Sequence, residues 1–224
     1  GMTSGTDAAG GGHAHTGMMI YLGDNWPAEY RGNVFTLNLH GLRMNQESLH
    51  QQGAGYVGKH AADFMFTSDK WFRGIELSYA PDGSVYVLDW SDIGECHDND
   101  GIHRTSGRIY RISYGKTEAA KVDLTKWSND NLTESAGSPN EWYSRQARQL
   151  IQQRAAAGQD LTKAALKLMN TYRLTSSTPT ALRAMWTLNA IGSSDEDWLL
   201  EQSNDEREHI RTWAIKLLCD QKAL

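Results

Sequence analysis

The chain has 224 residues, of which 39% are hydrophobic and 22% are charged, and its formal net charge is −5. This size allows one or two domains with a hydrophobic core, and the composition excludes a chain that is disordered throughout. Because the lysines and arginines form no run, nucleic acid is not expected as the main partner. No apolar run approaches about 18 residues, so no transmembrane helix is expected.

Residues 1–12 are mostly glycine, serine, threonine, alanine and aspartate, which predicts a flexible leader. They contain no apolar core, so no signal peptide is expected in this chain. The two cysteines, Cys96 and Cys219, fall in different predicted domains. A free thiol is the simpler interpretation of each, and a disulfide between them stays open.

The stretch from Trp71 to Asp92 predicts two antiparallel strands joined by a turn at Pro81-Asp82-Gly83. Apolar residues alternate along the first strand and occur on both faces of the second, which predicts that the second strand is covered on both sides. Further strands are expected at residues 13–21, 33–40, 42–49 and 107–114. Residues 13–115 therefore predict about two antiparallel blades of a β-propeller.

Residues 116–137 are polar and predict a linker, and from residue 138 onward apolar residues recur with the period of a helix. Three of the expected helices carry an arginine just ahead of an apolar stripe, namely Arg145, Arg183 and Arg211. Their irregular spacing lies near that of a HEAT-type repeat, and a plain helical bundle is the alternative. The expected fold is α+β and multidomain: a partial β-propeller followed by an all-α, HEAT-like domain at residues 138–224.

Two histidines begin the first predicted strand. His13 and His15 point to the same side of a strand, so both imidazoles can bind one metal ion or one anionic ligand. The simpler interpretation is two surface histidines at a frayed strand end. Farther along, Arg73 precedes the central hairpin, where a guanidinium is suited to clamp a carboxylate or phosphate with two hydrogen bonds.

A loop rich in carboxylates and histidines follows the hairpin; its candidate residues are Asp89, Asp92, Glu95, Cys96, His97, Asp98, Asp100 and His103. A hard cation such as Ca²⁺ would take the carboxylates of this loop, whereas Zn²⁺ would prefer His97, His103 and Cys96. The residues expected to hold a metal ion are Asp92, Glu95, His97 and Asp100. A carboxylate–histidine pair here also suits a general base for an alcohol proton. A solvated acidic loop without a site is the alternative.

Three long stretches carry a family resemblance: GGHAHTGMMIYLGDNWPAEYRGNVFTLNLHG, GAGYVGKHAADFMFTSDKWFRGIELSYAPDGSVYVLDWSDIGECHD and HRTSGRIYRISYG. Together they resemble the C-terminal part of the membrane-bound dehydrogenase family of planctomycetes and related bacteria. The resemblance implies a glucose/sorbosone dehydrogenase-like β-propeller followed by HEAT-like helices. It also implies a periplasmic or extracytoplasmic location.

The resemblance implies oxidation of a carbohydrate or alcohol substrate through a PQQ-type quinone, with Ca²⁺ as a further cofactor. His97 or His103, oriented by Asp89 or Asp92, would take the substrate hydroxyl proton. Arg73 would hold the quinone's carboxylates, and His13 and His15 would line the cavity mouth.

Two departures from the family pattern limit this expectation. A propeller of six blades at about 40–45 residues each needs more β structure than this chain has. The basic position expected near Leu39 and His40 has no lysine or arginine. We therefore expect an inactive C-terminal fragment without a bound cofactor. The alternative is a non-catalytic propeller/HEAT module that binds a protein, through its helical repeats, or a glycan, with a metal site in the acidic loop.

Overall fold

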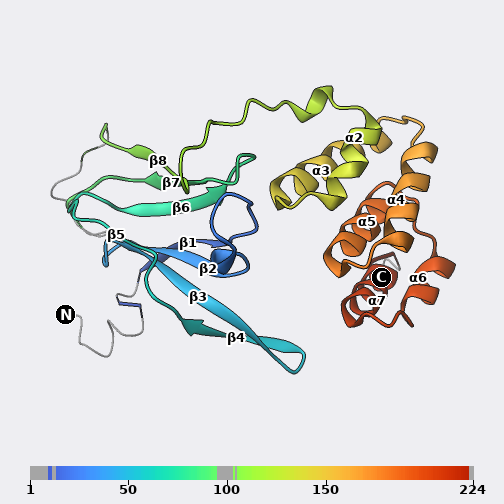
Figure 1. The fold of residues 1–224 in the computed structure, drawn as a ribbon, viewed down its shortest axis with the longest axis horizontal. Coiled ribbons are helices and arrows are strands. Elements are labelled where there is room, and N and C mark those ends of the chain that lie inside the picture. The colour runs from blue at the N-terminus through green and yellow to red at the C-terminus, as the bar shows by residue number, and fades with distance from the viewer. Residues whose placement is uncertain (1–9, 12–13, 95–102, 104, 222–224) are drawn as a thin grey trace. The chain divides into compact units, whose positions relative to one another are not determined.

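The computed structural model describes residues 10–11, 14–94, 103 and 105–221. The chain divides into two compact units, Gly1–Ala120 and Lys121–Leu224. In the described residues the first unit, called here the β unit, consists of antiparallel sheets, and the second, the helical unit, of α-helices (Figure 1). The α+β class expected from the sequence is therefore confirmed.

The β unit contains two antiparallel sheets. The first has the strand order β1-β2-β3-β4, and β5 pairs with the end of β3; the strands are β1 (His15–Ile20), β2 (Val34–Asn38), β3 (Arg43–Gln52), β4 (Gly55–His60) and β5 (Met65–Phe66). A short 3-10 helix, η1 (Ala28–Tyr30), lies between β1 and β2. The second sheet has the order β6-β7-β8, formed by Gly74–Tyr79, Val85–Asp89 and Arg108–Ile112.

The expected central hairpin is β6–β7. Its turn is closed by a hydrogen bond from Gly83 N to Ala80 O of 2.9 Å. One face of β7 is buried, since Val85 and Val87 are inaccessible, but Tyr86 and Leu88 on the other face are 36% and 39% exposed. The expectation that β7 is covered on both sides is therefore wrong for the described residues. An apolar residue is compatible with burial, but its presence does not show that another element covers it.

Hydrogen bonds from side-chain hydroxyls to backbone carbonyls join the two sheets. Thr16 on β1 donates to Gly74 O on β6 at 2.7 Å. Gly17, at a bulge in β1, allows this approach: its φ is +55°, and a Cβ there would lie 2.8 Å from Leu77 Cδ2. The buried Tyr21 hydroxyl donates to Gly83 O at 2.7 Å and accepts from Trp26 N at 2.8 Å. Burial raises the pKa of Tyr21, which keeps the phenol a donor.

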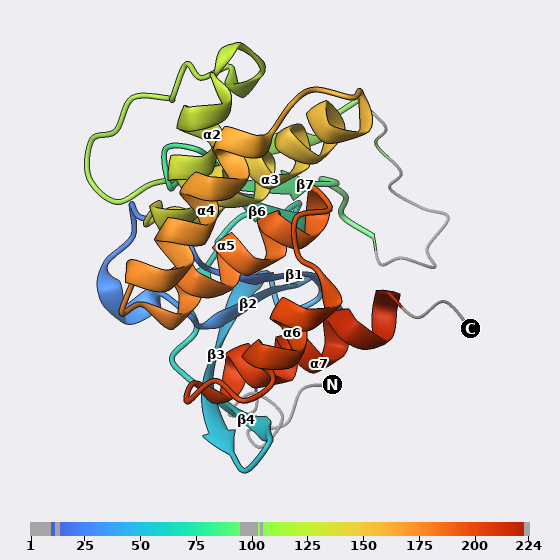
Figure 2. The ribbon, with the colours of Figure 1, turned by 90° about the vertical axis from the view of Figure 1, so that its right-hand side faces the viewer.

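The helical unit contains six α-helices in the described residues (Figure 2). They are α2 (Asn129–Glu134), α3 (Glu141–Ala156), α4 (Thr162–Leu174), α5 (Thr178–Ala190), α6 (Glu196–Gln202) and α7 (Glu208–Gln221), with 3-10 turns η2 (Leu124–Lys126) and η3 (Ser135–Gly137). Leu168, Met185 and Ile210 are among the fully buried core residues. Within the described part of the chain, none of the helices has the length and apolar character needed to cross a bilayer.

The linker expected at residues 116–137 is largely helical, so that boundary is corrected. Ser128 caps α2 by accepting from Asn131 N at 3.2 Å, and Leu124 and Leu132 are buried. Because α2 and the two flanking 3-10 helices are each shorter than two turns, their few apolar anchors show no helical period in the sequence.

Candidate functional site

A polar face of β3 forms the centre of the candidate site. Alternate residues of a strand share a face, so Arg43, Asn45 and Glu47 lie on the same side of β3. The β3–β4 hairpin pairs Glu47 with His60, and the chain then turns to place Asp63 beside them. We call these five residues the β3 polar cluster. None of them was singled out from the sequence, although the alternation of three polar residues in an expected strand is a usable signal.

Charged and amide groups in the cluster contact one another directly. Arg43 Nη1 lies 2.8 Å from Asp63 Oδ2, and Asn45 Nδ2 donates to Asp63 Oδ1 at 2.6 Å. His60 Nδ1 lies 2.8 Å from Glu47 Oε1, and its Nε2 lies 3.7 Å from Asp63 Oδ1. An ionised carboxylate can only accept a hydrogen bond, so the contact with Glu47 places the ring proton of His60 on Nδ1. The other ring nitrogen, Nε2, then faces Asp63. This arrangement orients an imidazole for proton transfer.

Gly10 packs directly against the cluster. Gly10 O accepts from Asn45 Nδ2 at 2.7 Å and from Asn38 Nδ2 at 3.0 Å. Gly10 has a φ of +95°, and a Cβ there would lie 2.9 Å from Asn45 Nδ2 and 3.3 Å from His60 Cε1. Part of the leader expected to be flexible, Gly10–Gly11, is therefore bound to the sheet.

Two further polar groups complete the surroundings of the cluster. His15 Nε2 lies 3.3 Å from Asn38 Nδ2, and Asn38 shares the Gly10 carbonyl with Asn45 of the cluster. Asn45 Oδ1 is buried and has no hydrogen-bond partner among the described residues. A buried amide oxygen without a donor is uncommon in native proteins and marks a position where a ligand hydroxyl can donate.

Asp89, expected to orient a catalytic histidine, is instead held by its own chain. Its Oδ1 accepts from the backbone amides of Arg73 at 2.7 Å and Ser91 at 2.8 Å, and its Oδ2 accepts from Arg108 Nε at 2.7 Å. Arg108 also pairs with Asp69. Hydrogen bonds from Trp71 N and Arg108 lower the pKa of Asp69. These contacts tie β7 and β8 to the segment before β6.

The other expected members of that site are not brought together in the described residues. Asp92 accepts from Gly94 N at 3.2 Å, whereas His103 is exposed and its ring lies edge-on to Trp71, 5.6 Å between centroids. No hydrogen bond among the described residues joins His103 to Asp89 or Asp92. The expected site residues His13, Glu95, His97 and Asp100 lie outside the described residues, as does Cys96.

Arg73 does not present its guanidinium to a ligand. It donates to the carbonyls of Lys70 and Phe72 from Nη1, of Ile93 from Nη2 and of Gly94 from Nε, at 2.8–3.1 Å. Arg43, Arg108 and Arg111 are likewise paired, with Asp63, Asp89 and Asp82. These arginines of the described β unit therefore do not fit the role of holding a quinone's carboxylates.

The described residues contain no group of three or more His, Cys, Asp or Glu side chains placed to hold a metal ion. The acidic-loop metal site stays a prediction, because Glu95, His97 and Asp100 lie outside this part of the chain. Cys219 is an exposed free thiol.

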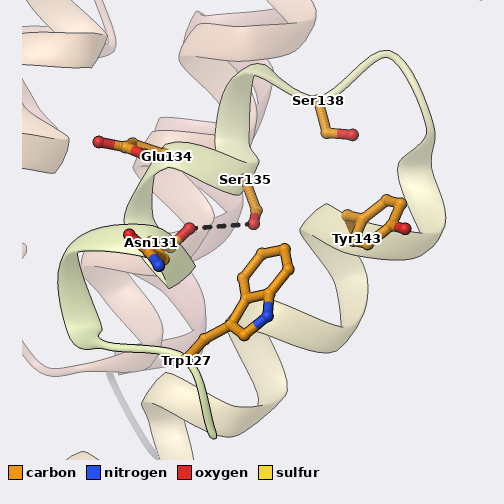
Figure 3. A pocket seen from close by; sticks show the side chains of 6 residues that line it. All are labelled: Trp127, Asn131, Glu134, Ser135, Ser138 and Tyr143. Atoms are coloured by element: carbon orange, nitrogen blue, oxygen red, sulfur yellow. Dashed lines mark hydrogen bonds between the residues drawn. The ribbon is translucent and has the colours of Figure 1, made fainter. Parts of the chain in front are cut away.

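A hollow of about 440 Å³ lies in the helical unit beside η2, α2 and α3 (Figure 3). The rings of Trp127 and Tyr143 stand nearly parallel at its wall, with 5.9 Å between centroids and 11° between planes. The polar lining residues are Asn131, Glu134, Ser135 and Ser138. Flat aromatic faces next to hydroxyl, amide and carboxylate groups are typical of sites for ligands with both apolar and polar surface.

Comparison with known proteins gives a family but no characterised relative. No curated protein and no solved structure matches the chain. A family model described as a domain of unknown function (DUF7133) matches residues 2–116, just over half of the chain, so the chain belongs to that family.

Proposed function

We propose that this chain supplies a hydroxyl-binding, proton-accepting part of a sugar or alcohol dehydrogenase-like protein. The observation that carries the proposal is the position of His60 between the carboxylates of Glu47 and Asp63. Arg43 and Asn45 fix Asp63, which leaves the geometry of the imidazole defined from both sides. The family resemblance supplies the substrate class and an extracytoplasmic location.

The sheet arrangement supports a β-propeller for the β unit. The two antiparallel sheets contact each other through β6, β1 and β2, and each also has exposed apolar residues, such as Met18 (71%) and Ile109 (70%). In a propeller every blade is covered on both faces, so such residues are expected where neighbouring blades pack. Among the described residues the sheets do not close into a ring.

The helix contacts support a HEAT-like array for the helical unit. Consecutive helices pair, as α2–α3, α4–α5 and α6–α7. Equivalent members of successive pairs also pack on each other, as α2 on α4, α3 on α5 and α5 on α7. This stacking of helical hairpins is the pattern of an α-solenoid.

In the proposed reaction His60 accepts the proton of a substrate hydroxyl at Nε2, and Glu47 stabilises the imidazolium through Nδ1. Asn45 Oδ1 accepts a hydrogen bond from a second hydroxyl, which satisfies this buried acceptor. Because the described arginines do not fit a quinone, no step through that cofactor is assigned to this chain.

The test is binding of aldoses and alditols by calorimetry, with His60→Gln as the variant. The substitution should weaken binding about tenfold, because it removes the imidazole that accepts a hydrogen bond from the substrate hydroxyl. His50→Gln is the matched control, because His50 is an exposed histidine of the same hairpin, on β3 rather than β4. Equal affinities of the two variants and the wild type would refute the site. Dye reduction in the presence of pyrroloquinoline quinone and Ca²⁺ would show instead that the chain holds the quinone.

The Trp127–Tyr143 hollow supports a second candidate function, glycan binding without catalysis. Stacking of a sugar ring on Trp127 would quench the fluorescence of Trp127. The neighbouring serine hydroxyls and the Asn131 amide would form hydrogen bonds with the sugar hydroxyls. Tyr143→Leu should abolish the quenching while His60→Gln leaves it unchanged. The reverse pattern would assign sugar binding to the β3 polar cluster.

A further inference from the structure

A cationic and aromatic site lies on the helical unit, on helices α3, α5 and α7. Arg148 of α3 places its guanidinium over the Trp186 ring of α5, 5.4 Å from the centroid. Trp213 of α7 meets Trp186 edge-on, with 4.9 Å between centroids and 67° between planes. Because α3 packs on α5 and α5 on α7, these side chains form a continuous row across the three helices.

Two N–H groups of this row have no acceptor. Arg148 Nη1 and Trp186 Nε1 are both buried and make no hydrogen bond among the described residues. In that part of the chain Arg148 also has no ion-pair partner, in contrast to Arg183 on α5. Buried donors are nearly always paired in native proteins, so unpaired donors on two stacked side chains indicate a missing acceptor.

The charges around Arg148 leave it uncompensated. Glu141 is the carboxylate that favours its charged form, but Glu141 pairs with Arg183 at 2.5 Å. Arg183 and Arg145 add positive charge of their own. Burial lowers the pKa of Arg148, opposed by Glu141 and reinforced by these two arginines. The site therefore has an excess of positive charge in a partly desolvated setting, which favours an anionic ligand.

We propose that Arg148 Nη1 and Trp186 Nε1 bind a carboxylate group of an acidic polypeptide segment. Two donors and one positive charge match the two oxygens and the single charge of a carboxylate, whereas a phosphate calls for more donors. The indoles of Trp186 and Trp213 offer apolar surface for the stem of the acidic side chain. Both side chains keep part of their surface exposed while Nη1 and Nε1 are buried, so binding requires these groups to turn toward solvent.

The test uses the full chain and a hexaglutamate peptide at low ionic strength, with hexaglutamine as the uncharged counterpart. Calorimetry should detect binding of hexaglutamate and none of hexaglutamine. Arg148→Met and Trp186→Phe should each weaken binding about tenfold, because each removes one donor and the second keeps the ring. Arg173→Met, at an exposed arginine of α4, is the control and should leave the affinity unchanged.

A stability measurement separates this role from simple packing. Arg148→Met removes an unpaired, partly buried charge, so in the absence of peptide its Tm should equal or exceed that of the wild type. A lower Tm together with unchanged peptide binding would make Arg148 a packing residue and overturn the proposal. Failure of hexaglutamate to bind the wild type would do the same. Inorganic phosphate that binds as tightly and displaces the peptide would overturn the assignment to a polypeptide carboxylate.

Discussion

Asp89 anchors the β unit through three groups of its own chain, and its side chain is inaccessible to solvent. Asp89→Asn removes the charge that pairs with Arg108 and should lower the free energy of unfolding by about 3 kcal/mol. Chemical denaturation followed by tryptophan fluorescence measures this loss. Asp92→Asn is the control and should cost no more than about 0.5 kcal/mol, because among the described residues the Asp92 carboxylate accepts only one long bond, from Gly94 N. Equal losses would contradict an anchoring role for Asp89.

Asp205 gives the helical unit a defined acid sensitivity. Hydrogen bonds from Arg207 lower the pKa of Asp205 from 3.8 to about 2. Because the folded value lies below the unfolded one, the stabilisation is present above about pH 4 and is lost as the pH falls towards 2. Asp205→Asn should cost about 1 kcal/mol at pH 7, and its Tm should converge with that of the wild type between pH 4 and pH 2. A Tm difference independent of pH, measured by circular dichroism, would contradict the pairing.

Single residues show where sequence reasoning stops. His15 is expected at a site from its residue type, and in the structure its ring contacts Asn38. The role of His60 and Asp63 cannot be derived from the sequence, because it depends on the register that pairs Glu47 with His60 across β3 and β4. Arg73 has the right residue type to bind an anion, but it donates to four backbone carbonyls, two before β6 and two after β7. Residue type is visible in a sequence, whereas the partner is a property of the fold.

Strand β1 approaches β6 closely at Gly17, and this contact gives a prediction for the element. Gly17→Ala places a methyl group 2.8 Å from Leu77 Cδ2 and 2.9 Å from Glu76 Cα, at a φ of +55°. The substitution should destabilise the β unit by about 2–3 kcal/mol, from overpacking and backbone strain together. Gly58→Ala on β4 is the control, since no atom lies within 4 Å of its Cβ position. Denaturation midpoints that shift equally would show that β1 does not pack tightly on β6.

Elements with a strong local signal were predictable from the sequence. The turn at Pro81-Asp82-Gly83 and the alternation around it define the β6–β7 hairpin. Helix α2 was missed because one and a half turns with a serine cap leave too few apolar positions to show a period. The exposed face of β7 was missed because cover by another sheet is a tertiary property.

At the scale of the whole molecule, the sequence predicts a β part followed by a helical part, and the chain divides between Ala120 and Lys121, inside the expected linker. A ring of blades could not be derived from the sequence pattern alone, since strand alternation specifies a two-faced sheet but not the number of sheets or their closure. That question depends on contacts between elements far apart in the chain.

The two units have separate hydrophobic cores, with Phe35 and Val87 in the β unit and Leu168 and Met185 in the helical unit. Separate cores unfold as separate cooperative blocks, so calorimetry should resolve two transitions.

Glu141→Gln breaks the buried pair with Arg183, whose side chains are 7% and 10% exposed. The substitution should lower the free energy of unfolding of the helical unit, followed by ellipticity at 222 nm, by about 3 kcal/mol. The unfolding transition of the β unit should stay unchanged. Gly17→Ala should act on the other transition alone. If either substitution moves both transitions together, the units are coupled and the chain folds as one cooperative block.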